Sequence, residues 1–247
     1  MTGQNFSLNV RMGNWNEELF LEEDTIKRFM LKRDRGELLV QKTRLLFKNL
    51  LKEVSLDLPD NSFIRFGYVI QITAPECCRE GESSGIILSG LVNEKEVDKI
   101  QHFVEGCLIT GSTFLEPCVR NSFKICSADN SFRDGQPLTY GQHFCISAIE
   151  PNECDPLYIE SEVPHILSTL GKSKHPLLRL TNFKNIYCFW KILPLDHEYR
   201  EELEGTPVPC NTRVVIRHVA SNRNLAVEGH VWFTTFFGSE CELSVYS

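Results

Sequence analysis

The pattern that decides the fold occurs twice, as Phe66-Gly67-Tyr68-Val69-Ile70-Gln71-Ile72 and as Tyr140-Gly141-Gln142-His143-Phe144-Cys145-Ile146. Each stretch has an aromatic residue, a glycine, two variable residues and then two apolar residues separated by a variable one. A weaker third copy, Asn-Thr-Arg-Val-Val-Ile over residues 211–216, has Asn211 in the place of the glycine. Gly and Asn adopt a positive φ more readily than most residues. The pattern therefore predicts the same turn before a strand in all three copies, which are 74 and 70 residues apart.

Each copy continues with a second apolar stretch, at residues 86–88, 157–159 and 224–226. The first two copies then end on a closing stretch, Phe123-Lys124-Ile125 or Trp190-Lys191-Ile192, whereas the third would have to close beyond residue 247. Three such units favour a closed barrel with pseudo-threefold symmetry, although a chance alignment of short apolar motifs is the alternative. We predict an α+β chain whose residues 59–247 form a mainly-β, β-trefoil-like domain with an incomplete third unit.

Residues 1–58 have helical rather than strand periodicity. One apolar stripe precedes Gly36 and a second follows it, which predicts two helices or one helix kinked at Gly36. Acidic side chains come first and basic ones later, as the helix dipole favours. Residues 1–12 are expected to be an extended arm. Further short helices are expected over residues 93–104 and near residues 197–203. The stripes comprise Leu19, Ile26, Phe29 and Met30, then Leu38, Leu39, Leu45, Leu46 and Leu50.

The helical segment is also basic, although the chain has a net charge of −7. Residues 26–52 contain nine Lys or Arg residues against Asp34 and Glu37. They form either a solvated helix face or a surface that docks on an acidic partner. Nucleic acid is disfavoured by the acidic pI of about 5.6 and the absence of a binding motif. A membrane surface is disfavoured because the apolar face of the segment is thin and has no tryptophan after Trp15. An acidic protein such as tubulin remains.

Five residues are the candidate contacts with that partner. Four are basic side chains of the segment, and the fifth is a tryptophan that either anchors the arm on a partner or packs on its own domain. They are Trp15, Lys42, Arg44, Lys48 and Lys52.

The ten cysteines indicate neither a disulfide framework nor a metal site. No C-x-x-C motif occurs, and Cys77 and Cys78 are adjacent. The N-terminal residues have no apolar signal segment, so we expect reduced and mostly buried thiols. We expect no bound metal and no cofactor.

Catalytic signatures are also missing. Leu170-Gly171-Lys172-Ser173 resembles the end of a phosphate-binding loop, but that loop requires glycine where Ile166 stands. His143 and Cys145 suit a cysteine hydrolase, yet Val69 and Gln71 occupy the matched positions of the first copy. We therefore expect no enzyme.

A second functional alternative is a soluble trefoil module that binds a sugar or an inositol phosphate. Its basic group would be Arg213, Arg217 and Arg223. This alternative depends on fold analogy alone.

Four stretches point to a known family: residues 10–17, 32–41, 140–145 and 204–209. With them the chain resembles the cilia- and flagella-associated protein 161 family, from Val10 to Glu242. The resemblance implies a structural microtubule inner protein of the ciliary or flagellar axoneme, without enzymatic activity. Its partners would be α/β-tubulin of the doublet microtubule and neighbouring inner proteins, and it would brace the A tubule for motility. Family members continue with further strands, which agrees with an incomplete third unit.

Overall fold

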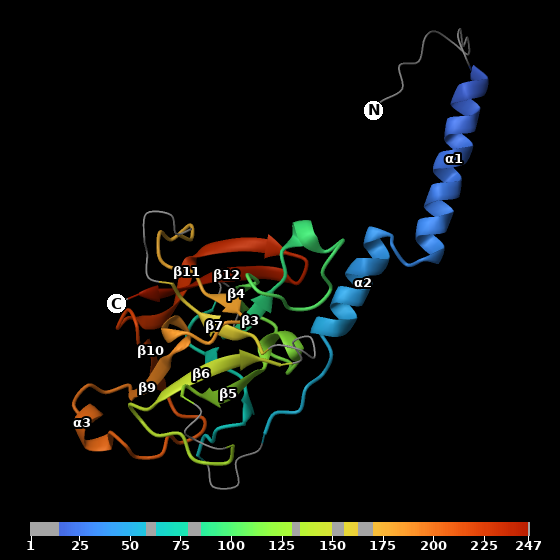
Figure 1. Cartoon of the computed structure of the whole chain (residues 1–247). Coiled ribbons are helices and arrows are strands. Elements are labelled where there is room, and N and C mark those ends of the chain that lie inside the picture. The colour runs from blue at the N-terminus through green and yellow to red at the C-terminus, as the bar shows by residue number, and fades with distance from the viewer. Residues whose placement is uncertain are drawn as a thin grey trace.

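A computed structural model describes residues 15–57, 63–78, 85–129, 134–149, 156–162 and 170–246. The expected extended arm over residues 1–12 lies outside these ranges. Figure 1 shows two helices followed by a β domain, with the first helix pointing away from it. The predicted order of a helical N-terminal segment and a mainly-β domain is therefore confirmed.

The N-terminal segment forms two helices, α1 (Trp15–Asp34) and α2 (Leu39–Leu50). In α1 ion pairs join Asp24 to Arg28 at 2.7 Å and Glu23 to Lys27 at 3.5 Å. Between the helices Gly36 has φ +74°, a conformation that a Cβ atom disfavours. The break predicted at Gly36 is confirmed.

Helix α2 packs against the β domain. Leu46 and Leu50 are fully buried and belong to the main hydrophobic core. Asn49 donates from Nδ2 to the carbonyl oxygen of Gln101 at 2.9 Å. Phe47 meets the ring of Phe237 edge-on, with the ring centroids 5.2 Å apart. Apolar burial and these side-chain contacts fix α2 on the domain.

Antiparallel pairing joins all the strands into one sheet. Eight of them form a closed circuit, in the order β6, β7, β8, β4, β12, β11, β10, β9 and back to β6. Closure removes sheet edges that would otherwise expose unpaired backbone groups. The strands are β1 (Val69–Ile70), β2 (Thr73–Ala74), β3 (Ile86–Leu91), β4 (Leu108–Ser112), β5 (Phe123–Ser127), β6 (His143–Ala148), β7 (Tyr158–Glu160), β8 (Arg179–Thr181), β9 (Trp190–Pro194), β10 (Val214–His218), β11 (Asn224–Thr235) and β12 (Gly238–Tyr246).

The predicted turn is present in all three copies. Gly67, Gly141 and Asn211 have φ values of +91°, +80° and +54°. The strands β1, β6 and β10 follow these turns. The second apolar stretches contribute to β3, β7 and β11, and the two closing stretches to β5 and β9.

A ring of backbone hydrogen bonds joins the three copies at matched positions. Ile64 donates to Val208, Leu138 donates to Ile64 and Val208 donates to Leu138, each at 2.9 Å. These residues have the same 74- and 70-residue spacing as the turns. The three copies therefore meet around one approximate axis, whereas the full β-trefoil arrangement stays a prediction.

The prediction of a short helix over residues 93–104 is wrong in its length. Only a 3-10 turn, η1 (Glu94–Glu96), forms there, with the side chain of Asn93 accepting from the Lys95 amide at 3.1 Å. Val97 and Phe103 are both buried in the core, so tertiary packing overrides the local helical pattern. The helix expected near residues 197–203 is present as α3 (Arg200–Leu203). The remaining 3-10 turns are η2 (Val119–Asn121) and η3 (Ile186–Cys188).

Trp190 lies at the centre of the barrel core. It is fully buried, and its Nε1 donates to the carbonyl oxygen of Ile159 at 3.1 Å. Phe144 and Phe123 are equally buried in the same cluster. The core therefore unites side chains of the first and second copies. No helix among the described residues is long and apolar enough to span a membrane.

Candidate partner-binding surface

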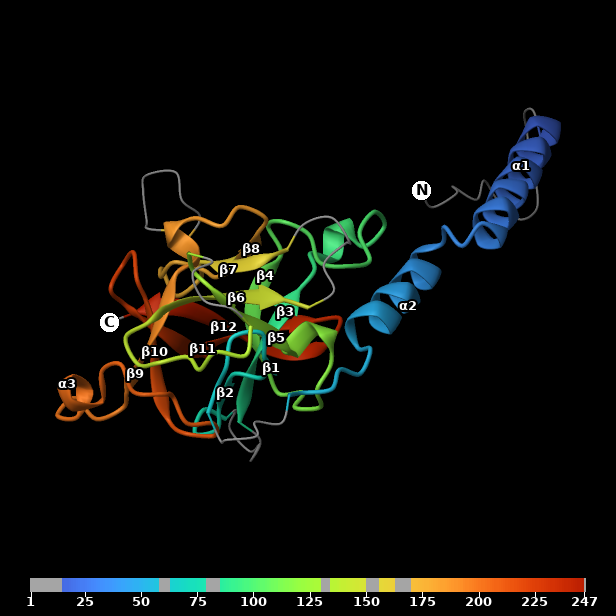
Figure 2. The same cartoon turned by 60° about the horizontal axis from the view of Figure 1, so that its bottom comes forward.

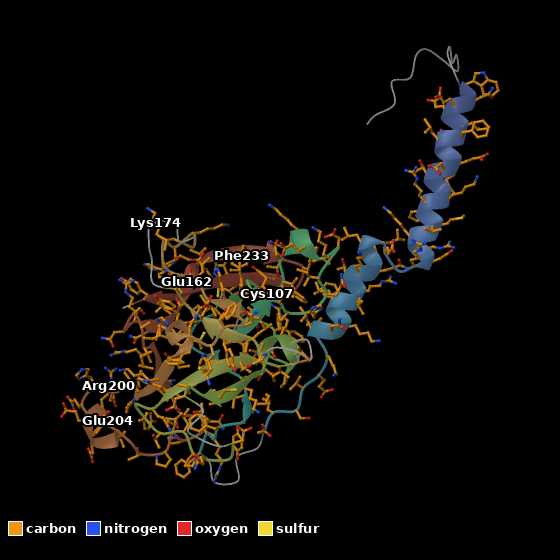
Figure 3. All side chains as sticks on the ribbon, viewed as in Figure 1. Cys107, Glu162, Lys174, Arg200, Glu204 and Phe233 are labelled. Carbon is orange, nitrogen blue, oxygen red and sulfur yellow. The ribbon has the colours of Figure 1, made fainter. Side chains whose placement is uncertain are left out.

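Helix α1 exposes every residue along its length. Trp15 begins the helix and is 58% exposed, so it does not pack on the β domain. Figure 3 shows the side chains of α1 projecting on all sides into open space. An exposed indole at the end of a projecting helix has the amphipathic character of an interface anchor.

The basic residues of α2 divide between two environments. Arg44 and Lys48 are exposed and lie one helical turn apart. Lys42 is different, because its Nζ donates to the backbone oxygen of Asp98 in the β domain. Lys52 is exposed just beyond the helix, and its backbone oxygen accepts from the Val119 amide at 3.0 Å. Arg44 and Lys48 thus share an outward face of α2, whereas Lys42 holds α2 on the β domain.

Trp15 lies apart from this basic group. The twenty residues of α1 span about 30 Å. A partner that contacts both must therefore extend along the helical arm. We call α1 together with the outward residues of α2 the arm surface.

Sequence reasoning missed several apolar residues of the arm surface. Phe20, Leu21 and Leu31 lie outside the predicted stripe, and each is at least 50% exposed. A helix that packs on one side has a single apolar stripe. Apolar residues on its other faces could therefore have been noticed in the sequence. Apolar groups on several faces suit a helix enclosed by partners.

The loop that resembles part of a phosphate-binding motif binds a carboxylate of its own chain. The amides of Lys172 and Ser173 donate to the Glu242 carboxylate at 2.9 and 3.1 Å. A Cβ atom on Gly171 would lie 2.1 Å from the same carboxylate. The anion site of this loop is therefore filled from within.

His143 and Cys145 do not form a reactive pair. Cys145 is fully buried, and this burial raises the pKa of its thiol to about 12. His143 is exposed on the same strand. A nucleophilic cysteine needs the opposite, a lowered pKa and access to substrate. The nine cysteines of the described residues form no disulfide with one another.

The described residues contain no group of three His, Cys, Asp or Glu side chains that suits a metal ion. Two of the three arginines of the ligand-binding alternative also have internal partners. Arg213 pairs with Glu76 at 2.6 Å, and Arg217 donates to the Asn224 side chain at 3.0 Å. This alternative is therefore not favoured.

A pocket of about 550 Å³ lies between β9, β10 and α3. Figure 3 places Arg200 and Glu204 at this end of the molecule. The pocket has charges of both signs, so it does not offer the uniformly basic lining that an inositol phosphate requires. Its charged lining includes Lys191, Arg200, Arg217, Glu198, Glu201 and Glu204.

Together these features define the class: a closed antiparallel β barrel that bears an exposed helical arm. Comparison with known proteins then gives the family. The model of the cilia- and flagella-associated protein 161-like domain matches residues 42–247. The chain belongs to the cilia- and flagella-associated protein 161 family, and is thus a cilia- and flagella-associated protein.

Relatives match almost the whole chain. The protein named cilia- and flagella-associated protein 161 in Danio rerio is 33% identical over 251 residues, covering 98% of this chain and 82% of the relative. The Mus musculus protein of the same name is 33% identical over 245 residues, covering 96% and 80%. Neither name is that of an enzyme, and both support a location in cilia or flagella.

A solved structure shares the fold. It is a Caenorhabditis elegans protein described as having unknown function, 13% identical, with a TM-score of 0.54. The similarity covers 76% of this chain and 92% of the other. At this identity the likeness concerns the fold alone.

Proposed function

We propose that this protein is a structural microtubule inner protein of the axoneme, without enzymatic activity. It would stabilise the A tubule of doublet microtubules, with α/β-tubulin and neighbouring inner proteins as partners. The observation that carries the proposal is the arm surface, which exposes large apolar side chains and the cations Arg44 and Lys48 away from the β domain. Family membership supports the ciliary setting.

The arm surface suits an acidic lattice for physical reasons. Exposed cations steer a protein towards an acidic surface, and buried aromatic anchors then contribute most of the binding energy. Many moderate contacts repeated along a lattice add up through avidity. Tight binding therefore does not require a deep pocket.

We also propose that residues 1–58 act as the docking arm and that residues 59–247 are a β-trefoil-like domain with an incomplete third unit. The pairings support this arrangement. In the first unit β1 pairs with β5, and in the second β6 pairs with β9. Consecutive units are joined by β5 with β6 and by β9 with β10. The second and third stretches of each unit form the pairs β3–β4, β7–β8 and β11–β12.

Fractionation of isolated motile cilia tests the proposed location. Detergent removes membrane and matrix, high salt removes dyneins, and mass spectrometry then quantifies the protein in each fraction. Retention with the doublets through high salt is expected for a protein bound inside the lattice. Release with the matrix contradicts the proposal.

Charge reversal tests the arm surface itself. The double variant Arg44→Glu with Lys48→Glu is expected to reduce incorporation into axonemes about tenfold or more, because cations and an acidic lattice then repel. The double variant Arg213→Glu with Arg223→Glu makes the same change of net charge on the β domain and serves as the control. Equal incorporation of both variants removes Arg44 and Lys48 from the interface.

A further inference from the structure

Helix α1 has an apolar stripe that no part of the β domain covers. Five large side chains lie in a band about 100° wide on one side of the helix. Each of them is at least 48% exposed, and no residue of α1 is buried. A helix with such a stripe is expected to pack it against a neighbour. The stripe comprises Trp15, Leu19, Ile26, Phe29 and Met30.

The charges of α1 divide between its two halves. Residues 15–24 contain five acidic side chains and no basic one, whereas residues 25–34 contain four basic side chains and a single acid, Asp34. The helix is therefore complementary in charge to a second copy of itself that runs in the opposite direction. Two parallel copies would instead bring like charges together.

We propose that α1 pairs with α1 of a second copy of this chain, in the antiparallel direction, through the apolar stripe. The two copies would be related by a two-fold axis that passes beside Asp24, the middle of the helix. Such a contact is isologous, because both copies use the same surface. The stripe supplies the area to be buried, and the two charged halves supply the direction.

Alignment of the two stripes over their full length gives the register. In it Leu19 of each copy faces Phe29 of the other, as in the alternating layers of a coiled coil. Trp15 of each copy lies against Arg33 of the other, where an indole and a guanidinium attract one another. The two-fold axis repeats both contacts, so each end of the pair has an apolar layer and a cation on an aromatic ring.

The middle of the pair is less apolar. Glu22 interrupts the stripe and faces Ile26 of the other copy, and a polar residue at such a position fixes the register at a cost in stability. On the flank of the stripe Glu18 meets Lys32 of the other copy, a pair of opposite charges that also occurs twice. The pair extends over only about 30 Å, so we expect an affinity in about the micromolar range.

The β domains leave room for this arrangement. Each domain follows the C-terminal end of its own α1, and Figures 1 and 2 show that α1 points away from the domain. In an antiparallel pair the two domains therefore lie at opposite ends of the helices. In a parallel pair both domains would crowd one end. Space and charge thus favour the same direction.

The inference goes beyond the proposed function and does not depend on it. A two-fold contact is closed, so it cannot repeat in one direction along a lattice. The pair is therefore a form of the free protein. Because it covers part of the arm surface, pairing and docking through α1 would compete.

One substitution on the stripe and one off it test the face. Sedimentation of the full chain is expected to show a mass that rises with concentration from the 28.4 kDa monomer towards the dimer. Ile26→Asp is expected to weaken association about tenfold or more, because it places carboxylates in the middle of the contact. Leu21→Asp makes the same change of charge about 140° around the helix and is the control. A full chain that stays monomeric at about 100 μM, or equal association of the two variants, overturns the proposal.

Charge exchange tests the direction. Glu18→Lys brings two lysines together on each flank, and Lys32→Glu brings two glutamates together, so each variant alone is expected to associate about fivefold more weakly. An equimolar mixture of the two variants restores opposite charges on both flanks and is expected to associate as the native chain does. Circular dichroism of each variant checks that α1 keeps its helical content. A mixture that associates no better than the separate variants overturns the antiparallel register.

Discussion

The second and third units of the barrel have the same repeat pattern but different packing. In the second unit Phe144 is 1% exposed, because it pairs with Ser127 of β5 on one side and with Trp190 of β9 on the other. The matched Val214 of the third unit is half-buried and pairs with β9 alone among the described residues. The same apolar pattern thus contributes more to stability where both neighbouring strands are present.

A buried ion pair also joins the third unit to the first. Arg120 and Glu240 are both almost fully buried and pair through Nη2 and Oε1. Thr110 donates to the second oxygen of Glu240 at 2.9 Å, and Arg120 Nε donates to the Gly90 oxygen at 3.2 Å. Glu240 lies in β12, which also pairs with β4 of the first unit.

Breaking that pair is the largest expected effect. Glu240→Ala leaves the Arg120 guanidinium buried without its partner, so we expect unfolding to require about 3–5 kcal/mol less free energy. Urea denaturation measures this. Thr110→Val removes one hydrogen bond to the same carboxylate and is expected to cost about 1 kcal/mol. If both variants cost the same, the third unit is not held through this ion pair.

Matched isoleucines test the difference in packing next. Ile146→Ala is expected to cost about 3 kcal/mol, because it leaves a cavity in a closed core. Ile72→Ala and Ile216→Ala are expected to cost about half as much, because water already reaches these side chains. Urea denaturation gives the unfolding free energy of each variant, so that the same Ile→Ala change is compared at three matched positions. Equal costs would mean that Ile72 and Ile216 are covered in solution as well as Ile146 is.

Hydrogen exchange tests the same difference without mutation. Amides of β10 over residues 214–216 are expected to exchange about tenfold faster than those of β6, because a strand with one neighbour opens at lower free energy. Hydrogen exchange followed by mass spectrometry measures both strands in the same chain. Equal exchange rates in β6 and β10 would contradict the difference in packing.

The repeat and its three turns could be predicted from the sequence, whereas burial and tertiary contacts could not. Gly67, Gly141 and Asn211 predicted the three turns because positive φ is a local property of the residue. The 3-10 turn at Glu94–Glu96 was missed because the burial of Val97 is a tertiary property. Lys42 looked like its basic neighbours, and only the packing of α2 shows that it bonds to Asp98.

The smallest expected effect is a pH dependence of stability, and it concerns a histidine of the third unit at a position where the second unit has an alanine. His218 occupies the position of Ala148 and is fully buried against Trp190, with the ring centroids 4.9 Å apart. Its Nε2 lies 2.9 Å from the Tyr187 oxygen and must donate to it, so Nδ1 accepts from Ser221 at 2.8 Å. The neutral ring is thus fully satisfied, and burial lowers the pKa of His218 below its usual value.

This arrangement should make the third unit sensitive to acid. The unfolded chain binds a proton near pH 6.5, whereas the folded chain binds it only at lower pH. The stability that neutral His218 contributes is therefore present above that pH and is lost as the pH falls towards the folded pKa. Chemical denaturation at pH 7.5 and 5.5 is expected to show a larger loss of unfolding free energy for the native chain than for His218→Gln. The same loss in both chains would assign the acid sensitivity to other groups, and the difference between the two units would then be one of strand pairing alone.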